Sequence, residues 1–260
     1  MIVRQAGFTL IEIAIALMIV AVLLGYTVAM LPLQQELRQY RSAEAEMDSI
    51  VEALVAFAQV NGRLPCPDTQ GDVNGTGAGT LDGAEDTDVD GSGNQSCKAF
   101  FGFLPGRTLG MVGDYNSAGT LMDPWTVGYG YAVSNGDAGD GNVDLITANN
   151  VRDEGMQNVA LNLDLLLCDD STANGNQMTC VAAGGSSVLN NIAAVVVSRG
   201  KNNTIPANST IQGENLDDFH DGTNDKVYIQ SPRREDYDDI VRWISPNLLF
   251  SRMIEADRLP

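Results

Sequence analysis

Histidine is almost absent from this chain of 260 residues, which contains only His220. A Ser–His–Asp triad needs a histidine as its base, and zinc sites favour histidine or closely spaced cysteines. His220 is surrounded by acids, which is typical of a polar loop. Acids are so abundant that carboxylate pairs like those of glycosidases are expected by chance. No glycine-rich stretch lies between a strand and a helix, so a phosphate-binding loop is not indicated. We therefore expect a protein that is not an enzyme.

Positive charge is scarce as well. Lysine and arginine together number 15 against 34 acids, and the formal net charge is −19. Such an excess of negative charge repels nucleic acid, so we expect no nucleic-acid partner. Most of the acids lie beyond residue 67 in stretches rich in glycine and asparagine. Their ordinary interpretation is a solvated surface, with cation binding as the alternative.

Charge is missing from residues 8–31, with the single exception of Glu12. A helix over this run would be about 36 Å long, enough to cross a hydrocarbon core of about 30 Å. Arg4, in the short leader of residues 1–7, favours a cytoplasmic location for the start of the chain. We predict a single-pass inner-membrane helix, with the globular domain in the periplasm.

Residues 32–60 predict an amphipathic continuation of this helix. Apolar side chains recur there at helical spacing; they are Leu37, Tyr40, Met47, Ile50, Val51, Leu54, Phe57 and Ala58. Pro32 should kink or locally unwind the helix, while Asn61-Gly62 and Pro65 should end it. The apolar stripe would pack on a globular domain formed by residues 61–260.

The globular domain alternates short apolar runs with glycine-rich loops. Strands are predicted at 128–133, 142–147, 192–198, 227–230 and 240–244, whereas 158–168 fits a strand or a helix. Ser245-Pro246 should open a final helix that ends near Ala256. We expect an α+β fold in which an antiparallel sheet packs on the long helix and residues 67–97 form a long loop.

The segment Gly7-Phe8-Thr9-Leu10-Ile11-Glu12 resembles the signal of type IV pilins and of the pseudopilins of type II secretion. In that family a prepilin peptidase cuts after the glycine and methylates the new amino terminus, which here implies cleavage between Gly7 and Phe8 and methylation of Phe8. The resemblance is close from Arg4 to about Leu24 and implies the lollipop architecture of a pilin. A plain signal-anchor helix is the alternative.

The resemblance also implies a role for Glu12. An unpaired carboxylate and an unpaired amine are both costly in an apolar helix bundle, so the Phe8 amine of one subunit would pair with Glu12 of its neighbour and guide assembly. The alternative is that Glu12 extends to the membrane interface.

Two further phrases resemble the major pseudopilin. Asp123-Pro124-Trp125 is followed by Tyr129 and Tyr131, and Ser198-Arg199-Gly200 leads into a loop rich in glycine and acids. In that relative the loop binds calcium; the matching stretch here, residues 213–218, does not align residue by residue. Insertions around 68–96 and 168–190 favour a minor subunit.

The cysteines lack the Cys-x-x-Cys spacing of zinc and redox sites. They are Cys66, Cys97, Cys168 and Cys180. An even number behind an export-type signal favours disulfides. Of the three connectivities, we favour Cys66–Cys97 and Cys168–Cys180, because each pair brackets one loop; four reduced thiols are the alternative.

Calcium is a candidate ligand of the acidic loops. Asp86, Asp88 and Asp90 are followed by Gly91, as at the start of an EF-hand loop, but Cys97 stands where a bidentate glutamate should be. A solvated loop is the alternative.

These features together predict a minor pilin or pseudopilin of a type IV pilus or type II secretion fibre. Its partners would be other pilin subunits, the prepilin peptidase and an inner-membrane assembly platform. It would lie in the inner membrane and then enter a periplasmic or surface fibre. A fibre-tip adhesin that binds a ligand through its Gly/Asp-rich loops is the alternative.

Replacing Gly7 tests the predicted cleavage. Gly7→Ala, or a bulkier change, should block processing because the peptidase of the resembled family cuts after glycine. Mass spectrometry of the wild-type chain should find Phe8 at its amino terminus, and an intact leader beginning at Met1 would contradict the prepilin interpretation.

Overall fold

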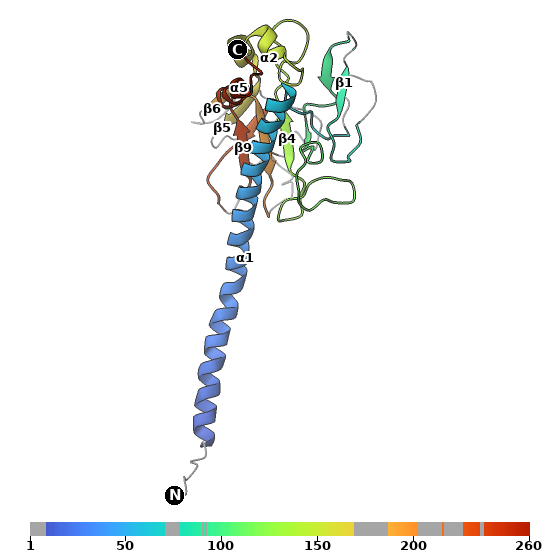
Figure 1. The fold of residues 1–260 in the computed structure, drawn as a ribbon. Helices are drawn as coiled ribbons and strands as arrows, with labels where there is room; N and C mark the ends of the chain where they lie inside the picture. Colours follow the sequence, from blue (N-terminus) through green and yellow to red (C-terminus); the bar gives the residue numbers. More distant parts are fainter. Residues whose placement is uncertain are drawn as a thin grey trace, which may run out of the picture. The chain divides into compact units, whose positions relative to one another are not determined.

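The computed structural model describes residues 9–70, 79–89, 91, 93–168, 187–201, 215, 226–234 and 237–260 (Figure 1). The side chains of residues 25–33, 187 and 188 lie outside this description. The chain forms two compact units, Met1–Ser42 and Ala43–Pro260.

The first unit contains the beginning of helix α1, which spans Leu10–Asn61. The helix continues through Pro32, so the local unwinding expected there does not occur. Leu37, which was expected on the apolar stripe, is 45% exposed. Within the described part of the chain, no helix has the length and apolar character needed to cross a membrane.

The second unit begins with the last part of α1, from Ala43 to Asn61. One face of this segment is completely buried; it consists of Ala43, Met47, Ile50, Leu54 and Ala58. The spacing of three and four residues places these side chains on one stripe, which confirms the amphipathic prediction for this segment. The helix ends where predicted, because Gly62 adopts the left-handed conformation (φ 69°) and donates its N–H to the carbonyl of Ala58.

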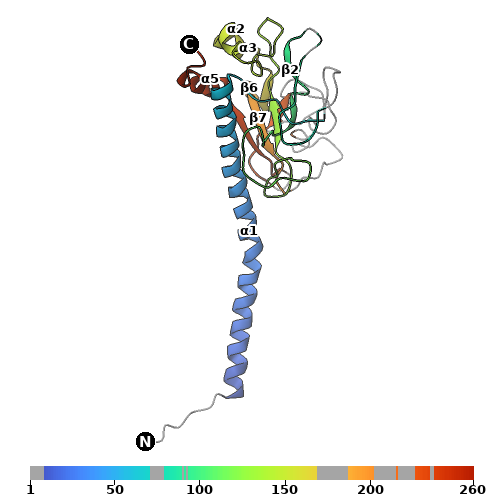
Figure 2. The same ribbon diagram turned by 45° about the vertical axis from the view of Figure 1, so that its right-hand side comes forward.

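A four-stranded antiparallel sheet with the order β3-β4-β7-β9 lies beside this segment of α1 (Figures 1 and 2). Its strands are β3 (Phe101–Phe103), β4 (Gly130–Val133), β7 (Ala194–Ser198) and β9 (Ile240–Ile244). Two polar contacts connect the helix to the sheet region: the hydroxyl of Tyr129 donates to Glu46 at 2.6 Å, and Arg242 of β9 pairs with Asp48 at 2.8 Å. The strands predicted near residues 130, 195 and 242 are confirmed.

A second sheet has the order β6-β5-β8. Its strands are β5 (Leu165–Cys168), β6 (Ser187–Ile192) and β8 (Val227–Ile229). Strand β5 pairs antiparallel with β6 but parallel with β8, so this second sheet is mixed and lies beside the antiparallel sheet that the sequence predicted. A continuous apolar core joins the two sheets; it contains Ala132, Leu165, Leu167, Ile192, Val195, Val197, Tyr228 and Val241. The α+β class, with an N-terminal helix followed by mainly antiparallel strands, is confirmed.

Three shorter helices follow α1 in the described part of the chain. They are α2 (Asn150–Glu154), α3 (Met156–Asn162) and α5 (Pro246–Glu255). The predicted final helix is confirmed with its cap, since Ser245 Oγ accepts the N–H of Leu248 at 3.2 Å. The ambiguous run 158–168 is helix first and strand afterwards. The predicted strand at 142–147 is wrong, because these residues form turns that lead into α2.

The two phrases that resemble the major pseudopilin meet in the folded unit. Asp123 Oδ2 accepts the hydroxyl of Ser198 at 2.7 Å, and Asp123 Oδ1 accepts the backbone N–H groups of Trp125 and Val127. Gly200 has φ 61°, and a Cβ atom there would lie 2.6 Å from the carbonyl oxygen of Asp238. The conformation and the close contact both require glycine.

The loop between α1 and β3 is more ordered than expected. It contains a hairpin of β1 (Thr87–Val89) and β2 (Gln95–Cys97), so the prediction of a long loop is wrong for these two strands. A disulfide joins Cys66 to Cys97, with the Cα atoms 5.5 Å apart. Arg63 and Glu85 form a two-pronged ion pair at 2.7 Å beside this bridge.

The disulfide loop also buries a carboxylate, that of Asp68. It accepts the N–H groups of Gly83 at 2.8 Å and of Asp82 at 3.3 Å. Burial is the main cause that raises the pKa of Asp68 to about 6; nearby acids contribute to this rise, while the two hydrogen bonds act in the opposite direction. The folded chain therefore binds a proton at Asp68 more tightly than the unfolded chain does.

Stability should consequently fall as the pH rises through the interval from about 4 to about 6. Asp68→Asn should reduce this slope by up to about 1.4 kcal/mol per pH unit, because one titrating group has been removed. Urea unfolding of the full chain in detergent at several pH values measures the slope. Asp114→Asn, which changes an exposed acid, is the matched control. An identical slope for wild type and Asp68→Asn would contradict the assignment.

Candidate assembly site

Glu12 lies in the first turn of α1 and is held there by Thr9. Its Oε2 accepts both the backbone N–H and the hydroxyl of Thr9 at 2.9 Å, and the N–H of Glu12 points back to Thr9 Oγ1 at 3.3 Å. This reciprocal arrangement is a capping box, which satisfies N–H groups at the start of a helix. Our sequence interpretation missed the role of Thr9, although the pattern Thr-x-x-Glu before an apolar run is a signal for it.

The apolar side chains on both sides of Glu12 are exposed to solvent. Every described side chain from Leu10 to Leu24 is exposed, including Leu10 at 90% and Leu24 at 59%. A continuous exposed apolar surface of this kind is typical of segments that are covered by a membrane or by other chains.

Several predicted site residues lie outside the described part of the chain. These are Gly7, Phe8, Asp90 and Cys180, together with the stretch 213–218 apart from Asn215. Much of the two insertions, at 71–78 and 169–186, lies outside it as well. The cleavage site, N-methylation site and adhesive loops stay predictions. Cys168 is disulfide-bonded, and its predicted partner is Cys180.

Of the calcium candidates in the hairpin, Asp86 and Asp88 are described. Asp86 precedes β1 and its Oδ2 accepts the N–H of Thr69 at 2.9 Å. Asp88 lies within β1 and faces Ser96 in the hairpin register. Residues 87–89 therefore form a strand of a hairpin and not the start of an EF-hand loop. Calcium binding by these acids stays a prediction.

A different group of acids comes together after β4. One carboxylate oxygen from each of Asp137, Asp140 and Asp144 lies within 4.8 Å of the other two. Asp137 and Asp140 are exposed, whereas Asp144 is fully buried, and this burial raises its pKa to about 6. Our sequence interpretation missed this group, although three aspartates within eight glycine-rich residues were a visible signal.

A buried polar network lies at the junction of β8 and β9. Asn215 donates to Asp239 Oδ2 at 3.0 Å and to the carbonyl of Ile229 at 2.9 Å. Burial raises the pKa of Asp239 to about 7 and lowers the pKa of Arg199. This network ties Asn215 to strand β8 and to Asp239, which is a structural role.

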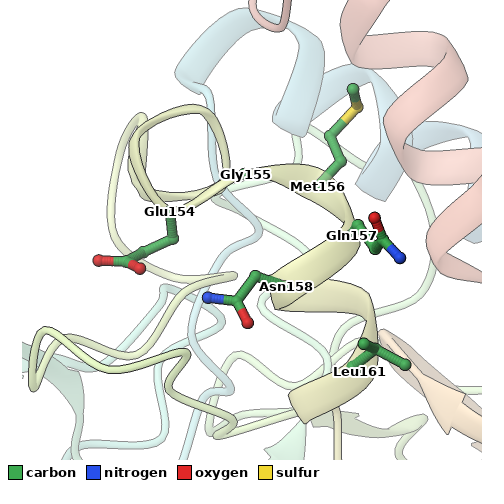
Figure 3. A pocket seen from close by; sticks show the side chains of 6 residues that line it. All are labelled: Glu154, Gly155, Met156, Gln157, Asn158 and Leu161. Atoms are coloured by element: carbon green, nitrogen blue, oxygen red, sulfur yellow. The ribbon is translucent and has the colours of Figure 1, made fainter.

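A shallow open pocket lies on α2 and α3 (Figure 3). It is lined by Glu154, Gly155, Met156, Gln157, Asn158 and Leu161. Figure 3 shows Asn158 extending away from the α3 backbone, and its amide donates to the carbonyl of Ala138 at 3.3 Å. Since the lining contains one carboxylate and no nucleophile–base pair, the pocket does not indicate catalysis.

A comparison with protein families matches residues 2–28 to the prokaryotic N-terminal methylation motif. No curated protein and no solved structure showed significant similarity to the chain. The matched residues contain Glu12, its partner Thr9 and the exposed apolar residues Leu10–Leu24. The chain therefore carries a type IV pilin/pseudopilin-like signal at its amino terminus.

Proposed function

We propose that this protein is a structural subunit of a type IV pilus or a type II secretion fibre, and a minor one. The observation that carries the proposal is the methylation motif placed on a charge-poor helix start whose single acid, Glu12, is oriented by Thr9. The motif points to a structural subunit rather than to an enzyme. The insertions after residue 67 and after Cys168 support a minor subunit over a compact major one.

Before assembly, residues 8–31 serve as an inner-membrane anchor. Support comes from the charge-poor sequence of this run and from the exposure of the side chains between Leu10 and Leu24. The periplasmic location of the second unit follows from Arg4 on the cytoplasmic side and from the Cys66–Cys97 disulfide, which needs an oxidising compartment.

During assembly, the apolar surface of one subunit exchanges lipid for the helices of its neighbours. Cleavage after Gly7 creates an amine at Phe8, next to the Thr9 that holds Glu12. In a helix bundle with little water, an amine and a carboxylate are stable only as a pair. Glu12 of one subunit and the Phe8 amine of another therefore fix the axial register of the fibre, and the capping box keeps the carboxylate at the helix start until that partner arrives.

Substitution of Glu12 tests this mechanism. Glu12→Val should leave membrane insertion and leader cleavage unchanged. It should reduce incorporation into the fibre by about tenfold or more, since a charge-assisted hydrogen bond contributes about 1.5–3 kcal/mol. Incorporation is measured by quantifying the subunit in purified fibres and by cross-linking to neighbouring subunits.

Two variants separate pairing from helix capping. Glu12→Gln keeps an oxygen that accepts the N–H of Thr9 but removes the charge, so it should fail in assembly as Glu12→Val does. Glu52→Val makes the same change at an exposed acid farther along α1 and should assemble normally. Normal incorporation of Glu12→Val, or full rescue by glutamine, would refute the pairing.

A further inference from the structure

The connection between β4 and α2 folds three carboxylates toward one point. The turn begins at Asp137, whose carboxylate accepts the N–H groups of Gly139 and Gly141 at 2.7 Å and 3.1 Å. Asp140 then accepts the N–H of Asn142 at 2.8 Å. These contacts place one oxygen each of Asp137, Asp140 and Asp144 within 4.8 Å of one another. Three negative charges at this separation repel each other unless something neutralises them.

The independent observation at this point is the state of Asp144. Its side chain is fully buried, with 0% exposure. Its Oδ1 accepts the amide of Asn150 at 2.9 Å, and the backbone N–H of Ala138 also acts on the carboxylate, but its Oδ2 is buried and has no donor in ordinary hydrogen-bond geometry among the described residues. A buried carboxylate oxygen without a donor costs free energy, because it has lost water and gained nothing in exchange. A cation would compensate both this loss and the mutual repulsion of the three carboxylates.

We propose that Asp137, Asp140 and Asp144 bind a calcium ion. The cluster offers only oxygen atoms, which hard cations prefer over the nitrogen and sulfur ligands typical of zinc. Calcium tolerates irregular coordination and takes up ligands from flexible loops, whereas magnesium requires a compact octahedron and keeps most of its water. Two exposed acids beside one buried acid form a site that is open to water on one side. Calcium can complete its coordination there with water molecules.

This site is distinct from the two calcium candidates suggested by the sequence. It lies in the connection before α2, neither in the hairpin segment of Asp86 and Asp88 nor in the loop that follows Gly200. The β2 strand nevertheless reaches the same turn, since the N–H of Gln95 donates to Asn142 Oδ1 at 3.2 Å. Asn150 of α2 and Asn158 of α3 donate to the turn from the other side. A bound ion would therefore hold the β1–β2 hairpin and the two short helices in a fixed arrangement.

The test is calcium titration of the full chain in detergent after treatment with a chelator. Isothermal calorimetry should detect binding at concentrations up to about 1 mM, the range of extracellular calcium modules, and calcium should raise the thermal unfolding temperature. Magnesium at the same concentration should have a clearly smaller effect. Absence of heat and of thermal stabilisation would overturn the proposal, and an equal response to magnesium would overturn the choice of calcium.

Four variants locate the ion. Asp140→Asn changes an exposed ligand, so it should fold normally while weakening calcium binding by about tenfold or more. Asp144→Asn should weaken calcium binding further. If this buried substitution prevents folding, the calcium affinity of Asp140→Asn alone tests the location. Asp153→Asn, an exposed acid of α2 outside the cluster, should bind calcium as wild type does. Unchanged affinity in Asp140→Asn, or loss of binding in Asp86→Asn instead, would overturn the location.

Discussion

The second unit depends on one packing constraint, the burial of a single face of α1 beside the four-stranded sheet. Along that face the large side chains of Met47, Ile50 and Leu54 lie between the small Ala43 and Ala58, and none of them is exposed. Deleting a large buried side chain from such a face costs about 2–5 kcal/mol, since the space is only partly refilled. Glu46 accepts a hydrogen bond from Tyr129, and Asp48 accepts one from Arg242. Because each acid binds one particular donor, these contacts make the apolar packing specific.

Strand pairing within the four-stranded sheet explains how the motifs of the domain are joined. Strands β4 and β7 are neighbours in the sheet, which brings the segment before β4 close to the end of β7. Asp123 and Ser198 are 75 residues apart in sequence, yet they are hydrogen-bonded at this point. A buried acid needs such partners, and Asp123 receives three of them: one hydroxyl and two backbone N–H groups. The two phrases that resemble the major pseudopilin are thus parts of one local structure.

The sequence predicted the elements whose signals are local. Helical periodicity identified the buried face of α1, β-branched runs identified β7 and β9, and Ser245-Pro246 identified the start of α5. It could not predict features that depend on pairing across the chain, such as the parallel contact between β5 and β8. The run 142–147 was mistaken for a strand because Val143, Leu145 and Ile146 are apolar, while the turn is imposed by Asp137 and Asp140 upstream. The three-carboxylate cluster depends on that turn and was missed with it.

Assembly and folding place opposite demands on carboxylates in this chain. Glu12 lies on an apolar helix, where its local partner Thr9 satisfies it in the free subunit and leaves its charge available for a cationic neighbour. Asp144 lies in a folded core, where its local partner Asn150 satisfies only one of its two oxygens. Because Glu12 is exposed, water can bind its second oxygen, whereas the buried Oδ2 of Asp144 is shielded from water. In the proposed function the fibre contact therefore forms after the subunit has folded, while the proposed cation at Asp144 belongs to the folded state of the subunit itself.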